Sequence, residues 1–242
     1  MKTALLATTV VMIASSITAP AAWAQSLCES AAGTTPVALV ERFISADCAA
    51  CWSAPVGPEQ APGTLTLDWI VPGAQGDDAP LSAAARRDAL MRLESLKMTP
   101  PETAALRRTE VVHDPAKSLR VANGVAVGDY MGAEIELKTA EVPASSPELS
   151  AWLVLIEKVA AGTQATPVAR NLVRNVHLTT WVMHPPLPNE PFSFFHELRP
   201  LTIPPGARVS NLRVVGWLQD SAGRVFNAAE SLCPPPEPGW AR

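Results

Sequence analysis

The chain has 242 residues, a formal net charge of −4, and charged side chains at only 17% of its positions. Acidic and basic residues are spread evenly along it, which excludes the concentrated basic surface that nucleic-acid-binding proteins use. Proline is frequent, at 24 residues, but hydrophobic residues make up 48%. This composition indicates many short elements with stiff connections rather than a disordered chain.

Residues 1–24 have the pattern of a secretory signal peptide. Lys2 gives a positive start, residues 4–17 form an apolar stretch, and the Ala-Trp-Ala at residues 22–24 matches a small-x-small cleavage site. The apolar stretch is too short to cross a bilayer. We therefore expect a periplasmic or secreted protein without a membrane span, whose mature chain is long enough for one large domain or two small ones.

Residues 36–52, PVALVERFISADCAACW, organise the first half of the chain. The apolar run at 37–44 predicts a strand buried on both faces, and the small and polar residues after it predict a turn. Ala49 and Ala50 favour a helix that begins at or just before Cys48. The sequence therefore predicts a strand, a turn, and a helix that starts at a Cys-x-x-Cys.

This arrangement has chemical consequences for Cys48 and Cys51. Free N–H groups and the positive dipole end in the first turn of a helix favour a thiolate, which makes Cys48 the expected nucleophile. Cys51 lies three residues on, on the same face, and can close a disulfide with it as the resolving cysteine. Asp47 opposes this, since a neighbouring carboxylate disfavours the thiolate. The alternative is a structural disulfide that never turns over.

Four further elements are expected before residue 141. Residues 64–71 predict a second strand, and residues 81–96 predict a helix whose apolar side chains share one face. The Asn-Gly at residues 123–124 lies between short apolar runs and predicts a two-residue hairpin. Asp129 is the expected cap of a helix that continues through Leu137.

The pattern changes after a Pro- and Ser-rich stretch at residues 142–149, which we interpret as a linker. Beyond it, apolar runs separated by Pro, Gly, Asn and Asp predict strands at residues 151–159, 170–183, 192–203, 209–220 and 224–231. Evenly spaced strands with turn signals between them indicate an antiparallel β-sandwich.

The chain resembles the secreted thioredoxin-like proteins of unknown function, which open with a strand, a Glu-x-Phe and a Cys-x-x-Cys. The matching residues are 40–43 (Val-Glu-Arg-Phe) and 48–51 (Cys-Ala-Ala-Cys), with fainter matches at 121–124, 127–129 and 218–223. The resemblance implies an α/β plus all-β fold. A thioredoxin-like domain is expected at residues 25–141 and a β-sandwich-like domain at residues 150–242.

The resemblance also implies roles for two residues outside the Cys-x-x-Cys. Glu41 stands where thioredoxins place a buried acid that relays a proton to the second cysteine, here Cys51. The alternative is an ion pair with Arg42 or another basic residue at the exposed end of the strand. Pro115 is the nearest candidate for the cis-proline that guides an extended substrate, although it falls short of the family's position.

Four cysteines in an exported chain suggest two disulfides. Cys48 and Cys51 form one natural pair. Cys28 and Cys233, near the two ends of the mature chain, are left to form a structural disulfide. The alternative for Cys28 is a bond to an external thiol.

The leading functional hypothesis is exported thiol–disulfide exchange, with protein thiols or disulfides as partners and with no cofactor. Cys48 would attack, Cys51 would resolve, and Glu41 would shuttle the proton. The rival hypothesis is a non-catalytic binding or assembly module in which both disulfides are structural. A third, copper handling, rests on the preference of copper(I) for soft ligands. The chain's four histidines, His113, His177, His184 and His196, do not have the spacing of a second ligand group, so no bound metal is expected.

Overall fold

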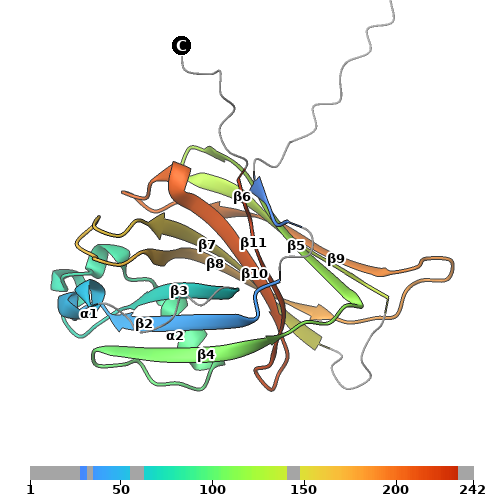
Figure 1. The fold of residues 1–242 in the computed structure, drawn as a ribbon, viewed down its shortest axis with the longest axis horizontal. Coiled ribbons are helices and arrows are strands. Elements are labelled where there is room, and N and C mark those ends of the chain that lie inside the picture. Colours follow the sequence, from blue (N-terminus) through green and yellow to red (C-terminus); the bar gives the residue numbers. More distant parts are fainter. Residues whose placement is uncertain (1–27, 32–34, 55–62, 141–147, 234–242) are drawn as a thin grey trace, which may run out of the picture.

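The computed structural model describes residues 28–31, 35–54, 63–140 and 148–233, and their fold is almost entirely β (Figure 1). The strands are β1 Cys28–Glu29, β2 Ala38–Ser45, β3 Thr64–Val71, β4 Ala104–Val112, β5 Lys117–Val127, β6 Tyr130–Thr139, β7 Glu148–Val159, β8 Arg170–Val182, β9 Ser193–Thr202, β10 Leu212–Gln219 and β11 Val225–Glu230. The helices are α1 Ala49–Ser53 and α2 Arg87–Ser95, with short 3-10 turns η1 Gly76–Asp78, η2 Ser82–Ala84 and η3 Val209–Asn211. No helix in these ranges is long and apolar enough to cross a membrane.

Seven of the strands close into a barrel in the order β10-β11-β4-β2-β3-β8-β7, and the others form a sheet in the order β1-β5-β6-β9. The barrel mixes parallel and antiparallel pairs. β2 pairs in parallel with β3 along its whole length, and α1 lies in the connection between them. The two long antiparallel ladders of the barrel join β7 to β8 and to β10.

Strand alternation sends side chains into two separate cores. On β7, Leu153 and Leu155 face the four-stranded sheet, whereas Trp152 and Val154 face the barrel interior. Gly216 of β10 marks the place where the sheet approaches the barrel closely. A Cβ there would lie 2.6 Å from the side chain of Val121 on β5, so a larger residue would push the two layers apart.

The expected thioredoxin-like fold is wrong, and so is the family resemblance on which it rested. The residues expected to form a helix from Asp129 to Leu137 form strand β6, in which Met131, Ala133, Ile135 and Leu137 are all buried. That spacing has the period of two that defines a strand with one buried face. The alternation of buried residues along this segment, and not the capping residue Asp129, determines its structure.

The expected hairpin is also absent, because residues 117–127 form one strand, β5, with an irregularity in its pairing between Asn123 and Ala126. The chain turns later, at Gly128 and Asp129, and Gly128 has the positive φ of 57° that favours glycine. The helix expected at residues 81–96 is shorter, since it is regular only in α2 after the turn η2.

The strands expected after residue 150 overlap the observed β7 to β11, but they do not form a β-sandwich of their own. β11 pairs with β4, β8 pairs with β3, and β9 pairs with β6, so each half of the chain completes sheets begun by the other. Most of the expected linker at 142–149 lies outside the described residues, and β7 begins at Glu148. The expected signal peptide at residues 1–24 lies wholly outside them.

Candidate functional site

The Cys-x-x-Cys lies at one end of the barrel, where β2 ends and α1 begins (Figure 1). Cys48 is the N-cap residue of α1, and its Sγ accepts a hydrogen bond from the backbone N–H of Cys51 at 3.3 Å. Both cysteines are partly exposed, and they form a disulfide whose Cα atoms are 5.3 Å apart. Because α1 has only five residues, the chemistry at Cys48 depends on this local N–H group rather than on a long helix dipole.

An apolar cluster holds α1 against the outside of the barrel. Trp52 of α1 is buried there with Ile44 of β2, Ile70 of β3 and Leu172 of β8. Cys51 packs against the same cluster. The helix is therefore attached to the barrel by apolar packing in addition to anything the disulfide contributes.

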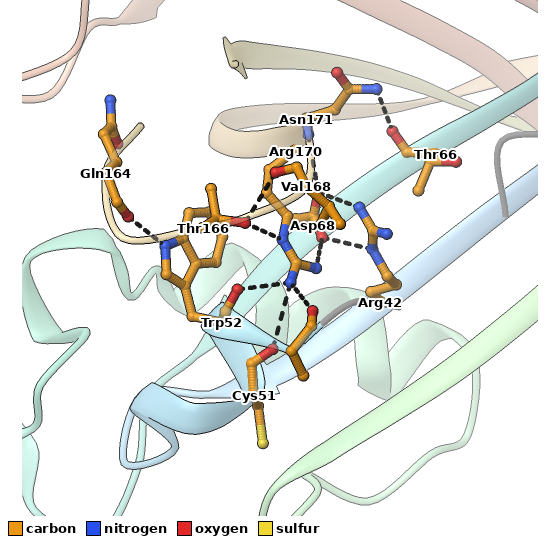
Figure 2. A network of polar contacts seen from close by, with 11 residues as sticks. Arg42, Cys51, Trp52, Thr66, Asp68, Gln164, Thr166, Val168, Arg170 and Asn171 are labelled. Atoms are coloured by element: carbon orange, nitrogen blue, oxygen red, sulfur yellow. Dashed lines mark hydrogen bonds and ion pairs between the residues drawn. The ribbon is translucent and has the colours of Figure 1, made fainter. Parts of the chain in front are cut away.

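Arg170, the first residue of β8, fixes the end of α1 to the barrel (Figure 2). Its Nη2 donates hydrogen bonds to the carbonyl oxygens of Trp52 at 2.7 Å and Ala54 at 2.9 Å. Its Nη1 donates to Asp68 of β3 at 3.3 Å, and the Arg170 side chain is fully buried. A cation therefore satisfies the carbonyl groups that a helix leaves unpaired at its C-terminal end.

The Asp68 carboxylate is the centre of this network. It accepts two hydrogen bonds from Arg42 of β2, at 2.6 Å and 2.7 Å, and one from the backbone N–H of Asn171 at 2.8 Å. Asp68 is fully buried, so two arginines compensate one carboxylate out of contact with water. We did not single out Asp68 or Arg170 from the sequence, although each is a charged residue within or beside an apolar run, and that was the available signal.

The loop between β7 and β8 is hydrogen-bonded to α1. Trp52 Nε1 donates to the carbonyl oxygen of Gln164 at 2.7 Å, and Ser53 Oγ donates to that of Ala165 at 3.0 Å. Gln164 and Ala165 have φ values of 48° and 56°, a left-handed conformation that side-chain-bearing residues rarely adopt. Thr166 Oγ1 accepts from Arg170 Nε at 3.2 Å, so the loop belongs to the same network.

The Asp47 carboxylate is bound by backbone N–H groups of the loop after β3. Its carboxylate accepts hydrogen bonds from the backbone N–H groups of Ala74 at 2.7 Å and Gln75 at 3.3 Å. A Cβ on Gly73 would lie 2.2 Å from the Asp47 carboxylate, which explains why glycine is needed there. The charge of Asp47 is thus engaged in holding the loop after β3.

Glu41 lies on the opposite face of β2 from the cysteine site. Its carboxylate accepts two hydrogen bonds from Arg92 of α2, both at 2.7 Å, and both side chains are fully buried. The Arg92 guanidinium also lies 4.6 Å from the Trp152 ring and 5.0 Å from the Trp217 ring. Alternation along β2 turns Glu41 and Phe43 into the barrel, whereas Ile44 faces Cys51. Neither sequence interpretation of Glu41 anticipated an interior partner.

Pro115 lies far from the cysteines along the barrel axis. It is exposed in the turn after β4, and β4 runs antiparallel to β2, with Glu110 opposite Ala38 and Ala104 opposite Ile44. Pro115 therefore follows the end of the barrel where β2 starts, whereas Cys48 follows the end where β2 stops. No peptide bond within the described ranges is cis.

Cys28 and Cys233 form the second disulfide and join the two ends of the described chain. Cys28 is in β1, which pairs with β5. Next to the bond, Glu29 and Leu232 exchange backbone hydrogen bonds at 3.1 Å and 2.9 Å. This disulfide thus locks the first and last described segments to the four-stranded sheet.

The described residues contain no group of three or more His, Cys, Asp or Glu side chains that could hold a metal ion. His196 lies 3.0 Å from Glu134 on the four-stranded sheet, and His177 lies 3.9 Å from Glu197 on the facing strands. These contacts are ordinary pairs on strand surfaces. The copper hypothesis therefore gains no support from the geometry.

Comparison with known proteins places the chain in no established family. No protein-family model matches it, and no curated protein sequence matches it. Among solved structures, it matches HBP35 of Porphyromonas gingivalis, with 10% sequence identity, coverage of 81% of this chain and 74% of that chain, and a TM-score of 0.43. A likeness at this level carries no argument about the function of the chain.

Proposed function

We propose that this is an exported thiol–disulfide exchange protein that acts through the Cys48–Cys51 disulfide. The observation that carries the proposal is that the disulfide is partly exposed and lies on a segment held in place by other means. Trp52 packing and the Arg170 hydrogen bonds to Trp52 and Ala54 attach α1 to the barrel. A disulfide that the fold does not need as a crosslink is free to open and close.

The lengths of the loops that the two disulfides close indicate that they contribute differently to stability. In the chain-entropy model, the Cys28–Cys233 bond, with a separation of 205 residues, stabilises the fold by about 5 kcal/mol. The Cys48–Cys51 bond spans only three residues, and the same relation gives it less than about 2 kcal/mol. The long-range disulfide is therefore well suited to a structural role, and the short one is not.

The proposed reaction starts with the oxidised protein. A partner thiolate attacks Cys48 Sγ, the Cys48–Cys51 bond breaks, and Cys51 leaves as a thiolate that takes up a proton from solvent. A second partner thiolate attacks the mixed disulfide and releases Cys48 as a thiolate, so the partner becomes oxidised by two electrons and the protein reduced by two. The N–H of Cys51 that contacts Cys48 Sγ at 3.3 Å stabilises negative charge on that sulfur. The reverse sequence oxidises the protein at the expense of a partner disulfide.

Two measurements on the mature protein test the proposal. A glutathione redox titration should place the Cys48–Cys51 couple between about −120 mV and −270 mV, the range of exchange proteins. After mild reduction, one equivalent of an alkylating agent near neutral pH should label Cys48 before Cys51, because Cys48 carries the N–H contact and Cys51 packs against the apolar cluster. A potential below about −300 mV would instead identify a structural disulfide.

The rival is a non-catalytic exported module in which both disulfides are structural. The buried network around Asp68 favours it, because so much polar anchoring beside α1 is also what a purely structural element would need. A reduction potential of the Cys48–Cys51 couple below about −300 mV, together with equal alkylation of Cys48 and Cys51, would support the non-catalytic module.

A further inference from the structure

A pocket of about 280 Å³ opens beside α1, and Trp52, the residue that follows Cys51, is part of its lining. Trp52 lines it on the side of α1, Leu81 and Ala84 line it on the side of η2, and Leu172 of β8 also lines it. Trp52 and Leu172 belong to the apolar cluster against which Cys51 packs, and Leu81 and Ala84 pack against the same cluster. The pocket and Cys51 therefore share part of the same apolar cluster.

The pocket also has a cationic element. Arg174 of β8 lines it, and the Nε and Nη2 groups of Arg174 both donate to Glu157 Oε2. These two bonds use two of the five N–H donors of the guanidinium, and both donors on Nη1 are among the three that remain. Glu157 is fully buried beneath Arg174, which itself is 7% exposed. The positive partner of this pair is therefore the one that reaches the pocket.

We propose that this pocket docks the partner polypeptide in the exchange reaction, receiving an apolar side chain next to the partner's reactive cysteine and pairing a neighbouring carboxylate with Arg174. The inference rests on the proposed function and names the partner's chemistry. At about 280 Å³, the pocket is smaller than most sites for drug-sized ligands or cofactors, which measure about 300–1,000 Å³. It is the right size for one or two side chains, and Trp52 connects it directly to Cys51.

Binding is tested on the oxidised, full-length mature protein with capped peptides that cannot undergo exchange. One peptide contains Ser-Leu-Asp and its match contains Ser-Leu-Lys, with serine in place of the reactive cysteine, and binding is followed by Trp fluorescence or calorimetry. The Asp peptide should bind at least about tenfold more tightly than the Lys peptide. Equal affinities would overturn the proposal, and this comparison needs no protein variant.

Exchange is tested with the corresponding Cys-Leu-Asp peptide and with dithiothreitol, which is small enough to need no docking pocket. Ala84→Phe fills the pocket, and Ala222→Phe, in the exposed turn before β11, is its matched control. Ala84→Phe should lower the ratio of the peptide rate to the dithiothreitol rate about tenfold. The control should change neither rate, and an unchanged ratio of the two rates in Ala84→Phe would overturn the docking site.

The two levels of the proposal fail in different ways. Selective binding of the serine peptide without any exchange by the cysteine peptide would support the pocket and overturn the proposed function. Exchange with dithiothreitol, together with equal rates for the Cys-Leu-Asp peptide in the wild-type protein and in Ala84→Phe, would support the function and overturn the pocket.

Discussion

Replacing Arg170 by Gln should cost roughly 3–5 kcal/mol of folding free energy, the range for breaking a buried ion pair by removing one partner. The Arg170 side chain is fully buried and lies 3.3 Å from Asp68. Asp68 keeps its two hydrogen bonds to Arg42, which limits the electrostatic part of the loss. The substitution also removes the donors to the Trp52 and Ala54 carbonyl oxygens, and each unpaired buried group adds about 1–3 kcal/mol.

Thermal unfolding measures the global effect. For a protein of this size, each kcal/mol shifts the melting temperature by about 2–4 °C, so Arg170→Gln should lower it by on the order of 10 °C. The matched control is Arg108→Gln on β4, whose ion pair with Glu110 is 47% and 70% exposed and should contribute at most about 1 kcal/mol. Amide exchange within α1 should rise more than in β7, because Arg170 acts at the end of α1.

The reasoning fails if Arg170→Gln and Arg108→Gln lower the melting temperature equally. Such a result would mean that Trp52 packing alone holds α1, and that the network in Figure 2 is secondary. A large drop in melting temperature without faster amide exchange in α1 would give a different result. It would mean that Arg170 stabilises the barrel, through Asp68, rather than α1.

Three further outcomes are expected. Glu41→Gln should destabilise the fold by roughly 3–5 kcal/mol, because its buried partner Arg92 loses its counter-ion. It should leave the rate of thiol–disulfide exchange at the Cys-x-x-Cys unchanged. A slower rate in a folded variant would support Glu41 as the proton relay. Replacing Cys28 and Cys233 together by Ala should cost about 2–5 kcal/mol in denaturant unfolding, and more than removing the Cys-x-x-Cys pair. Burial and the charge of Arg199 hold the pKa of His177 below its ordinary value. The unfolded state therefore binds more protons, and stability should fall as the pH drops through about 6.5; His177→Gln should flatten that loss, and an unchanged pH profile would exclude this residue as its source.

Local patterns in the sequence identified elements that local interactions decide. The apolar run before the cysteines became β2, and Cys48 became the N-cap of α1. The strands expected at residues 151–159 and 170–183 are β7 and β8 within a few residues at each end. The cysteine count led to the disulfide pairs that the structure contains. Each of these inferences needed only neighbouring residues or the presence of four cysteines.

The errors arose where local signals conflicted. At residues 129–137 an N-cap residue suggested a helix, and the alternating buried residues of β6 required a strand. The Asn-Gly that suggested a hairpin lies within β5, where the partner strand β6 tolerates an irregularity. The resemblance to thioredoxin-like proteins rested on a short block around the Cys-x-x-Cys and favoured the helix and the hairpin. The same Cys-x-x-Cys pattern occurs here beside a β-barrel.

The sequence by itself determined the positions of β2, β3, β7 and β8, the position of the Cys-x-x-Cys, and which cysteines remain to pair across the chain. Tertiary structure alone decided how the strands close into a barrel and which charges meet inside it. Glu41 is separated from Arg92 by 51 residues, and Asp68 from Arg170 by 102, so no local spacing reveals either pair. The physical reason is that hydrophobic periodicity is a property of one segment, whereas strand order and buried charge compensation depend on which segments become neighbours in space.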